Sequence, residues 1–289
     1  MPAASTTPPL VISIQSQVVF GHVGNSAAVF PMQAGGLEVA PIPTVLFSNT
    51  PRHPTRRGRA LPPDLFADLL LGARERGLPE RAAFLLTGYM GSAEVALLTA
   101  DFVEGARKVN PGLTVICDPV LGDTGPGLYV PLPVAGVIRD RLVPLADIVT
   151  PNPFELSWLS GKKVGTLADL VEARGALALG RGGRLVVTGA ALDDTAAGTL
   201  ETVVLHPGGT SRHPAPCLPA ALSGTGDLFA GLLTSGLGQG LTLDASVARA
   251  QRLTGMAMRA AMERGALEVV LSAPEFRREL LADEAPFPA

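Results

Sequence analysis

A run of small residues that ends in an aspartate, Ser223-Gly-Thr-Gly-Asp227, has the clearest chemical potential in this sequence. Its glycines can adopt backbone angles closed to other residues, and they leave no side chain between their amides and a ligand. The apolar helical pattern that follows adds free N–H groups and the positive end of a helix dipole. We therefore predict an anion hole at Gly224, Thr225 and Gly226, with Asp227 as a base that accepts a proton from an attacking hydroxyl.

The alternative is an ordinary helix cap, since Gly-Asp before an apolar run is a common helix start. Taken alone, the turn favours neither interpretation. The rest of the sequence favours the anion hole, because it contains no G-x-x-x-x-G-K-[ST] motif and only three lysines, Lys108, Lys162 and Lys163. Backbone amides would therefore have to bind a phosphate group.

Three carboxylates and a threonine follow predicted strands and could hold a metal ion. Asp118 comes directly after an apolar run, with Asp123 five residues later. Thr150 follows the next apolar run, and Glu155 stands three residues after Asn152 at the start of a helical pattern. Oxygen ligands of this kind suit Mg²⁺, which bridges nucleotide phosphates. The alternatives are a turn aspartate at Asp118 and a capping-box acid at Glu155, which could also play both parts.

These residues require elements that bring them together, and the hydrophobic pattern supplies them. Short apolar runs predict strands over 10–14, 83–87, 113–117, 148–149, 185–188 and 202–206, and helical patterns cover 62–76, 93–109, 134–142, 167–179, 228–237 and 245–263. This alternation predicts one α/β domain over 10–289, with an open, mostly parallel sheet and helices on both faces. Residues 1–9 are expected to be a disordered tail, and Pro41 and Pro43 confine 37–47 to an edge or a covering flap.

Polar residues recur at the carboxyl ends of these strands, where parallel sheets bind ligands. Ser16, Tyr89, Asp118, Thr150 and Thr188 each follow or end an apolar run. Ser16 has no local His or Asp partner, so we expect it to hydrogen-bond a substrate and not to act as a nucleophile. The recurrence predicts a small-molecule site along this edge.

Composition excludes several other classes of protein. A hydrophobic share of 47% with a mean hydropathy of +0.32 fits a compact globular chain, and no apolar run is long enough to span a membrane. The net charge of −3 and the scattered arginines give no basic stripe for nucleic acid. Cys117 and Cys217 form no disulfide framework or zinc motif, which favours a cytoplasmic protein.

From about Leu10 to Arg264 the chain resembles the pyridoxal kinases of the ribokinase-like superfamily. The G-T-G-D turn alone indicates the superfamily, and the opening Ile-Gln-Ser block and the Cys-Asp-Pro-Val block narrow it to the pyridoxal kinases. The motifs that carry the resemblance are Ser13–Ser26, Phe47-Ser-Asn49, Thr87-Gly-Tyr89, Cys117–Asp123, Val143–Asn152 and Ser223–Ala230.

The resemblance implies ATP-dependent phosphorylation of the 5′-hydroxymethyl group of pyridoxal, and also of pyridoxine and pyridoxamine. It implies Mg²⁺, leaves open a monovalent cation, and implies a homodimer. On the substrate side it implies Ser16, Val45, Phe47, Tyr89 and Tyr129, with Asp227 as catalytic base and Gly224, Thr225 and Gly226 as anion hole. Around ATP and the metal it implies Asp118, Thr150, Asn152, Glu155 and Thr188, with Arg212 in a variable loop over the nucleotide and Asp118, Thr150 and Glu155 nearest the metal.

The chain departs from the family at Thr50-Pro51, where the family has His-Thr and the threonine contacts the substrate. We therefore expect weaker pyridoxal binding, unless Thr50 compensates from one position earlier. Two other functions stay open: a hydroxymethylpyrimidine kinase of the same superfamily, whose usual glycine-rich opening with an early Asp-Pro is absent, and a vitamin B6-binding protein without turnover. The second is disfavoured because both the base and the glycines of the anion hole are present.

Overall fold

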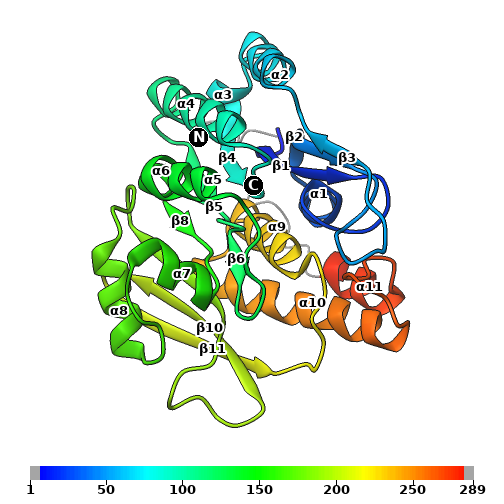
Figure 1. The fold of residues 1–289 in the computed structure, drawn as a ribbon, viewed down its shortest axis with the longest axis vertical. Coiled ribbons are helices and arrows are strands. Elements are labelled where there is room, and N and C mark those ends of the chain that lie inside the picture. The colour runs from blue at the N-terminus through cyan, green and yellow to red at the C-terminus, as the bar shows by residue number, and fades with distance from the viewer. Residues whose placement is uncertain (1–6, 283–289) are drawn as a thin grey trace, which may run out of the picture.

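The structure is a computed structural model that describes residues 7–282. Residues 1–6 of the expected tail and residues 283–289 of the expected domain lie outside the described residues. Within the described part, the helices and strands build one layered α/β arrangement with a central sheet (Figure 1).

Nine strands form the main sheet in residues 7–282, in the order β11-β10-β9-β8-β5-β4-β1-β2-β3. They are β1 (Leu10–Val18), β2 (Glu38–Phe47), β3 (Gly58–Ala60), β4 (Ala82–Thr87), β5 (Thr114–Cys117), β8 (Ile148–Val149), β9 (Arg184–Ala190), β10 (Thr199–His206) and β11 (Gly209–Pro216). The six strands from β9 to β2 are parallel, and only β3, β10 and β11 pair antiparallel. The prediction of an open, mostly parallel sheet is confirmed.

Helices cover both faces of the sheet, as predicted. The elements are α1 (Asn25–Ala34), α2 (Pro63–Glu75), α3 (Leu78–Arg81), α4 (Ala93–Val109), α5 (Leu132–Val137), the π-helical turn η1 (Ile138–Leu142), α6 (Val143–Leu145), α7 (Pro153–Ser160), α8 (Leu167–Ala176), α9 (Thr225–Gly238), α10 (Leu243–Glu263) and α11 (Pro274–Ala282). One face packs against α1, α9, α10 and α11, and the other against α2, α4, α5, α7 and α8. In residues 7–282 no helix is both long and apolar enough to cross a bilayer.

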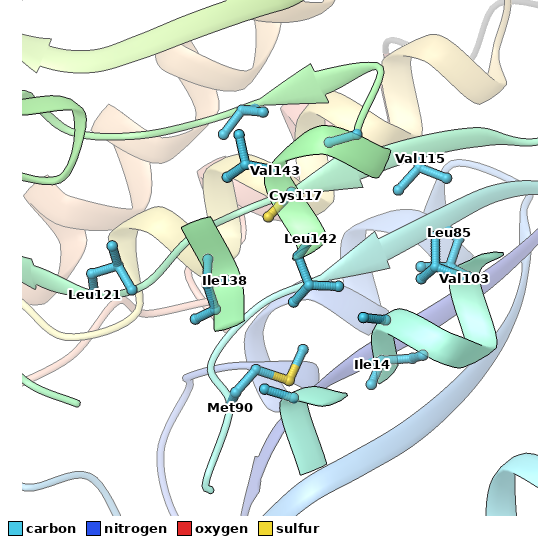
Figure 2. Close-up of a cluster of buried hydrophobic side chains, with 14 of the residues drawn as sticks. Ile14, Leu85, Met90, Val103, Val115, Cys117, Leu121, Ile138, Leu142 and Val143 are labelled. Atoms are coloured by element: carbon cyan, nitrogen blue, oxygen red, sulfur yellow. The ribbon is translucent and has the colours of Figure 1, made fainter. Parts of the chain in front are cut away.

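The period of two along each strand divides the core into these two layers. Leu85 faces the layer of α2 and α4, whereas its neighbour Leu86 faces the layer of α1 and α9. Figure 2 shows the first layer, in which Ile14, Leu85 and Val115 from three strands lie near Val103 of α4. Both faces of the central strands are therefore buried, which explains why they read as continuous apolar runs.

Several elements differ from the sequence prediction. The first strand extends beyond residue 14 to Val18, and residues 209–216 form the edge strand β11, not a loop. Strand β2 pairs with β1 along most of its length but with β3 only over Val45–Phe47, so the stretch with Pro41 and Pro43 does form an edge on that side. A small hairpin of β6 (Gly122–Asp123) and β7 (Gly127–Leu128) was not predicted, because two-residue strands carry no periodicity.

Candidate active site

The predicted strand ends meet at one edge of the sheet. Strand register places Thr87 beside Cys117 and Cys117 beside Val149, so the residues that follow these strands are neighbours. Backbone hydrogen bonds continue the ladder past the strands: Asp118 N donates to Thr87 O at 2.9 Å and Thr150 N donates to Cys117 O at 3.0 Å. The edge lies where the chain order of the sheet reverses around β1, a place where open α/β sheets bind ligands.

The glycine-rich stretch Ser223–Gly226, here called the anion turn, leads directly into α9. The helix begins at Thr225, three residues before the predicted start, so Gly226 and Asp227 belong to its first turn. Gly224 precedes the helix with a left-handed backbone (φ 83°). A Cβ atom at this position would overlap the carbonyl oxygen of His22, which only glycine avoids. The N–H groups of this first turn have no partner within the helix and are available to an anion.

Asp227 does not cap α9, because no side-chain hydrogen bond closes the start of this helix. Gly224 is the N-cap residue of α9, so the turn does start a helix, but without a cap from the Asp227 side chain. Asp227 Oδ1 is buried, and no donor among residues 7–282 reaches it. Burial raises the pKa of Asp227, and a backbone hydrogen bond from Gly24 opposes this shift in part. A buried carboxylate with a free oxygen and a raised pKa is suited to accept a proton.

Asp118 faces the same turn from the end of β5. A Cβ atom at Gly226 would lie 3.6 Å from Asp118 Oδ2. Thr150 Oγ1 donates to Asp118 Oδ1 at 3.1 Å, and Oδ2 is buried without a donor in the described part of the chain. The pKa of Asp118 is raised well above its ordinary value by burial and then by the carboxylates of Glu155 and Asp227.

A divalent cation fits this arrangement. The cation would bind the free Oδ2 of Asp118 and offset the negative charges around it. Thr150 would not bind the ion but would orient the Asp118 carboxylate through its hydrogen bond to Oδ1. Residues 7–282 contain no cluster of three or more His, Cys, Asp or Glu side chains that could by itself hold a metal ion. Mg²⁺ commonly uses one or two carboxylates, water and substrate phosphates, so Asp118 alone is compatible with it.

Glu155 has the capping role that the sequence analysis offered beside a metal role. It forms a capping box with Asn152 at the start of α7: Glu155 N donates to Asn152 Oδ1, and Asn152 N donates to Glu155 Oε2, both at 2.9 Å. Glu155 Oε1 accepts from the backbone of Leu121 at 2.8 Å and of Gly122 at 3.4 Å. Burial, despite these donors, raises the pKa of Glu155 to about 7.

The capping-box interpretation of Glu155 is thus confirmed. Both of its oxygens accept from backbone donors, so direct metal binding would require it to give these up. We assign Glu155 to shaping the turn that leads from Asp118 into the β6–β7 hairpin. Asn152 is engaged in the same turn, since its Nδ2 donates to Gly122 O at 2.8 Å. The side chains of Glu155 and Asn152 are both engaged by the protein backbone, and neither contact supports their predicted place at the nucleotide.

The predicted substrate-side residues lie on β1 and β2, beyond β4 and, for Tyr129, directly after β7. Ser16 is buried at an irregularity in the pairing of β1 with β2, between Gln15 and Gln17, and such bulges redirect side chains. Gly24 packs so closely on Ser16 that a Cβ atom there would overlap the Ser16 hydroxyl. Val45 is buried against Gly91, just after Tyr89, which fits its expected place in the wall of a pocket.

The charges of two arginines that the sequence prediction did not include act on the aromatic side chains of this side. The guanidinium of Arg56 lies 4.4 Å from the ring centre of Phe47. Burial raises the pKa of Tyr89, opposed by the charge of Arg56. Tyr129 is 50% exposed, and its pKa is raised chiefly by burial and opposed by Arg52. Residues 48–57, here called the β2–β3 loop, therefore bring positive charge to the aromatic wall.

Thr50 does not compensate for Pro51 in the expected way. It is buried, and its hydroxyl donates to Glu268 Oε2 at 2.8 Å. Pro51 itself is exposed. Glu268 was missed by the sequence prediction, although a single acid between Leu267 and Val269 was a usable signal of a buried carboxylate with a partner.

Two nucleotide-side predictions have different outcomes. Thr188 lies at the predicted edge, where its N–H donates to Pro151 O at 3.0 Å. Arg212 lies in β11 and not in a loop. Its guanidinium is bound by Asp194 (2.6 Å) and Glu201 (2.6 Å), so ATP would have to displace one of these carboxylates. We therefore leave Arg212 out of the proposed nucleotide site.

Known proteins resemble the chain over nearly its whole length. Residues 81–271 match the family model described as phosphomethylpyrimidine kinase. A pyridoxal kinase from Granulibacter bethesdensis is 38% identical over 96% of this chain and 98% of its own. A pyridoxine/pyridoxal/pyridoxamine kinase from Bordetella avium is 41% identical over 84% of this chain and 82% of its own. A Leishmania donovani pyridoxal kinase solved with ADP and ginkgotoxin has a TM-score of 0.85 at 30% identity, covering 94% of this chain and 95% of that one.

Proposed function

Since the chain belongs to the pyridoxal kinases, within the wider family described as phosphomethylpyrimidine kinase, we propose that it transfers the γ-phosphoryl group of ATP to the 5′-hydroxymethyl group of pyridoxal, pyridoxine and pyridoxamine. The observation that carries this proposal is Asp227, whose free, buried Oδ1 stands in the first turn of the helix that follows the anion turn. A base and converging N–H groups at one helix start suit phosphoryl transfer to a hydroxyl.

In the proposed mechanism the substrate hydroxyl donates its proton to Asp227 while its oxygen attacks the γ-phosphorus. The new O–P bond forms as the bond to the β-phosphate oxygen of ATP breaks, which gives ADP and the 5′-phosphate. Backbone N–H groups of the anion turn and of the start of α9 stabilise the charge on the transferred group. Ser16 hydrogen-bonds the pyridine ring, and Val45, Phe47, Tyr89 and Tyr129 form its walls.

Mg²⁺ would be held by Asp118, with Thr150 and Glu155 shaping its surroundings, and Thr188 would lie on the nucleotide side. The support is the free Oδ2 of Asp118 and the accumulation of negative charge around it. When bound, the ion neutralises charge on the ATP phosphates. A monovalent cation would act in the same electrostatic sense, but no residue contact here favours a particular place for it.

The decisive variant is Asp227→Asn, which keeps the size of the side chain but removes the proton acceptor. We expect kcat for pyridoxal to fall by about 10²-fold or more, with a smaller change in KM. The melting temperature at neutral pH should not fall, because burial of this carboxylate raises its pKa and so disfavours its charged form in the folded state.

The measurement is a coupled assay of ADP formation with pyridoxal, pyridoxine, pyridoxamine and hydroxymethylpyrimidine. Asp68→Asn, at an exposed position on α2, is the matched control and should leave kcat unchanged. An Asp227→Asn enzyme with near-normal kcat would remove the base from the mechanism.

A hydroxymethylpyrimidine kinase is the second candidate, favoured by the description of the matching family model. If the protein phosphorylates hydroxymethylpyrimidine faster than pyridoxal in the same assay, hydroxymethylpyrimidine kinase becomes the leading candidate. A protein that binds vitamin B6 without forming ADP would instead support the non-catalytic alternative.

We also propose that the protein is cytoplasmic and forms a homodimer. The support for the first is that both cysteines are free thiols. The support for the second is a group of exposed apolar side chains at the end of β1 and on β2, namely Val19, Phe20 and Leu46. Mass measurement in solution tests the dimer.

A further inference from the structure

Glu268 is a buried acid outside the residues assigned to the chemistry. It lies between α10 and α11 with 7% of its surface exposed. Its backbone pairs with the anion turn: Ser223 N donates to Leu267 O and Val269 N donates to Ser223 O, both at 3.1 Å. The residue is therefore fixed next to the start of α9.

Its carboxylate reaches two other segments of the active site. Oε2 accepts the hydrogen bond of the buried Thr50 hydroxyl at 2.8 Å, and Oε1 lies 3.4 Å from His53 Nε2. Both partners belong to the β2–β3 loop. On another side the carboxylate packs against the backbone of Gly21, where a Cβ atom would overlap Oε1. Gly21 begins the glycine turn that ends in Gly24, which contacts Ser16.

The middle of the β2–β3 loop is held by this carboxylate through Thr50 and His53. The start of the loop is also anchored at the end of β1, where Phe20 N donates to Ser48 O at 2.9 Å. Beyond Ser48 its other contacts include local ones, such as Asn49 Nδ2 to Thr55 O at 2.8 Å, and an edge-to-face contact of His53 with Phe20 at 5.6 Å. The same loop carries Arg56 over Phe47. The place of Arg56 over Phe47 is therefore linked to Glu268.

We propose that Glu268 is a positioning residue that ties the β2–β3 loop to the anion turn. It would thereby hold the aromatic wall of the substrate site at a fixed distance and orientation from the phosphate-binding segment. The inference rests on the proposed function for its kinetic consequence. The tether itself does not, because it is a contact between residues of the protein. A hydrogen bond from Thr50 to a buried carboxylate is of the stronger, charge-assisted kind.

Limited proteolysis tests the tether without any substrate. The loop contains trypsin sites at Arg52, Arg56 and Arg57, whose side chains are exposed. Cleavage requires the loop backbone to unfold locally, which becomes easier when the loop detaches. In Glu268→Ala we expect the initial cleavage rate in this loop to rise by about tenfold or more, measured well below the melting temperature. Glu263→Ala, at an exposed position at the end of α10, is the matched control and should cleave like the unchanged protein.

Kinetics test the positioning role. Glu268→Ala should raise KM for pyridoxal by about tenfold while KM for ATP stays within about twofold, and Glu268→Gln should recover part of the loss because its amide oxygen still accepts from Thr50. Thr50→Val, a change of similar shape, should repeat the effect and keep the test available if Glu268→Ala folds poorly. The two changes together should cost no more than the larger one alone.

Unchanged cleavage in both Glu268→Ala and Thr50→Val would overturn the tether. Raised cleavage with equal changes in KM for pyridoxal and ATP would overturn the positioning role. Absence of pyridoxal phosphorylation in the unchanged protein would instead overturn the proposed function, and the cleavage result would still decide the tether.

Discussion

Replacement of Gly224 by alanine separates the role of the anion turn in catalysis from its role in stability. Gly224 and Gly240 have the same left-handed backbone, φ 83° in each. They differ in their surroundings: a Cβ atom at Gly224 would overlap His22 O, whereas nothing lies within 4 Å of one at Gly240. Gly240→Ala is therefore a control that introduces the backbone strain without a steric overlap.

An alanine in the left-handed conformation is strained by about 1 to 2 kcal/mol. The free energy of unfolding of both variants should therefore fall by about this amount. Only Gly224→Ala must also separate the anion turn from the turn that carries His22, because Cβ contacts shorter than 3.0 Å do not occur in real proteins. A displacement of about 1 Å in a catalytic segment can cost about 10² in rate. We expect kcat to fall by about that factor in Gly224→Ala and by less than about twofold in Gly240→Ala.

The assay is steady-state ADP formation with pyridoxal, together with the melting temperature of each variant by calorimetry. Similar losses of stability with a large difference in kcat would support the anion turn. Equal kcat values in the two variants would refute the reasoning, because phosphate binding would then not depend on the position of Gly224.

Three further predictions concern charge and the substrate loop. Glu155→Gln should lower the melting temperature, because the amide nitrogen of glutamine would face backbone N–H donors. It should also reduce kcat by the same factor at low and high Mg²⁺. Recovery of kcat at high Mg²⁺ would instead support direct metal binding by Glu155. Activity should decline in acid at a higher pH than the value of about 4 typical of aspartate, because burial raises the pKa of Asp227 and only its ionised form accepts a proton; a pH profile without such a limb contradicts the base. Pro51→Thr should lower KM for pyridoxal by a few-fold, about the value of one neutral hydrogen bond, with KM for ATP unchanged; an unchanged KM for pyridoxal would mean that this loop does not touch the substrate.

Local chemistry explains what could be predicted. The anion turn, Asp227 and the capping box at Glu155 are contiguous patterns whose function depends on neighbours one to four residues away. The parallel sheet follows from hydrophobic period and length, and parallel strands necessarily bring Asp118 and Thr150 to one edge. These features were therefore available from the sequence.

Long-range contacts explain what could not. Arg212 was expected in a loop, but its pairing with Asp194 and Glu201 depends on how β10 and β11 align. The start of α9 was placed three residues late, at Leu228 in place of Thr225. The close approach of Gly224 to His22, which is distant in sequence, was likewise not predicted.

The sequence by itself determined the class of fold, the sheet edge at which Asp118 and Thr150 meet, and the residue proposed as base. Only the tertiary structure decided which carboxylates have free oxygens and which are already satisfied: Asp118 and Asp227 have one each, whereas Glu155 is engaged by the backbone. It also revealed that Thr50 is bound to Glu268, 218 residues away. The physical reason is that hydrogen-bond satisfaction of a buried group depends on every segment packed around it, and a local pattern contains only one of those segments.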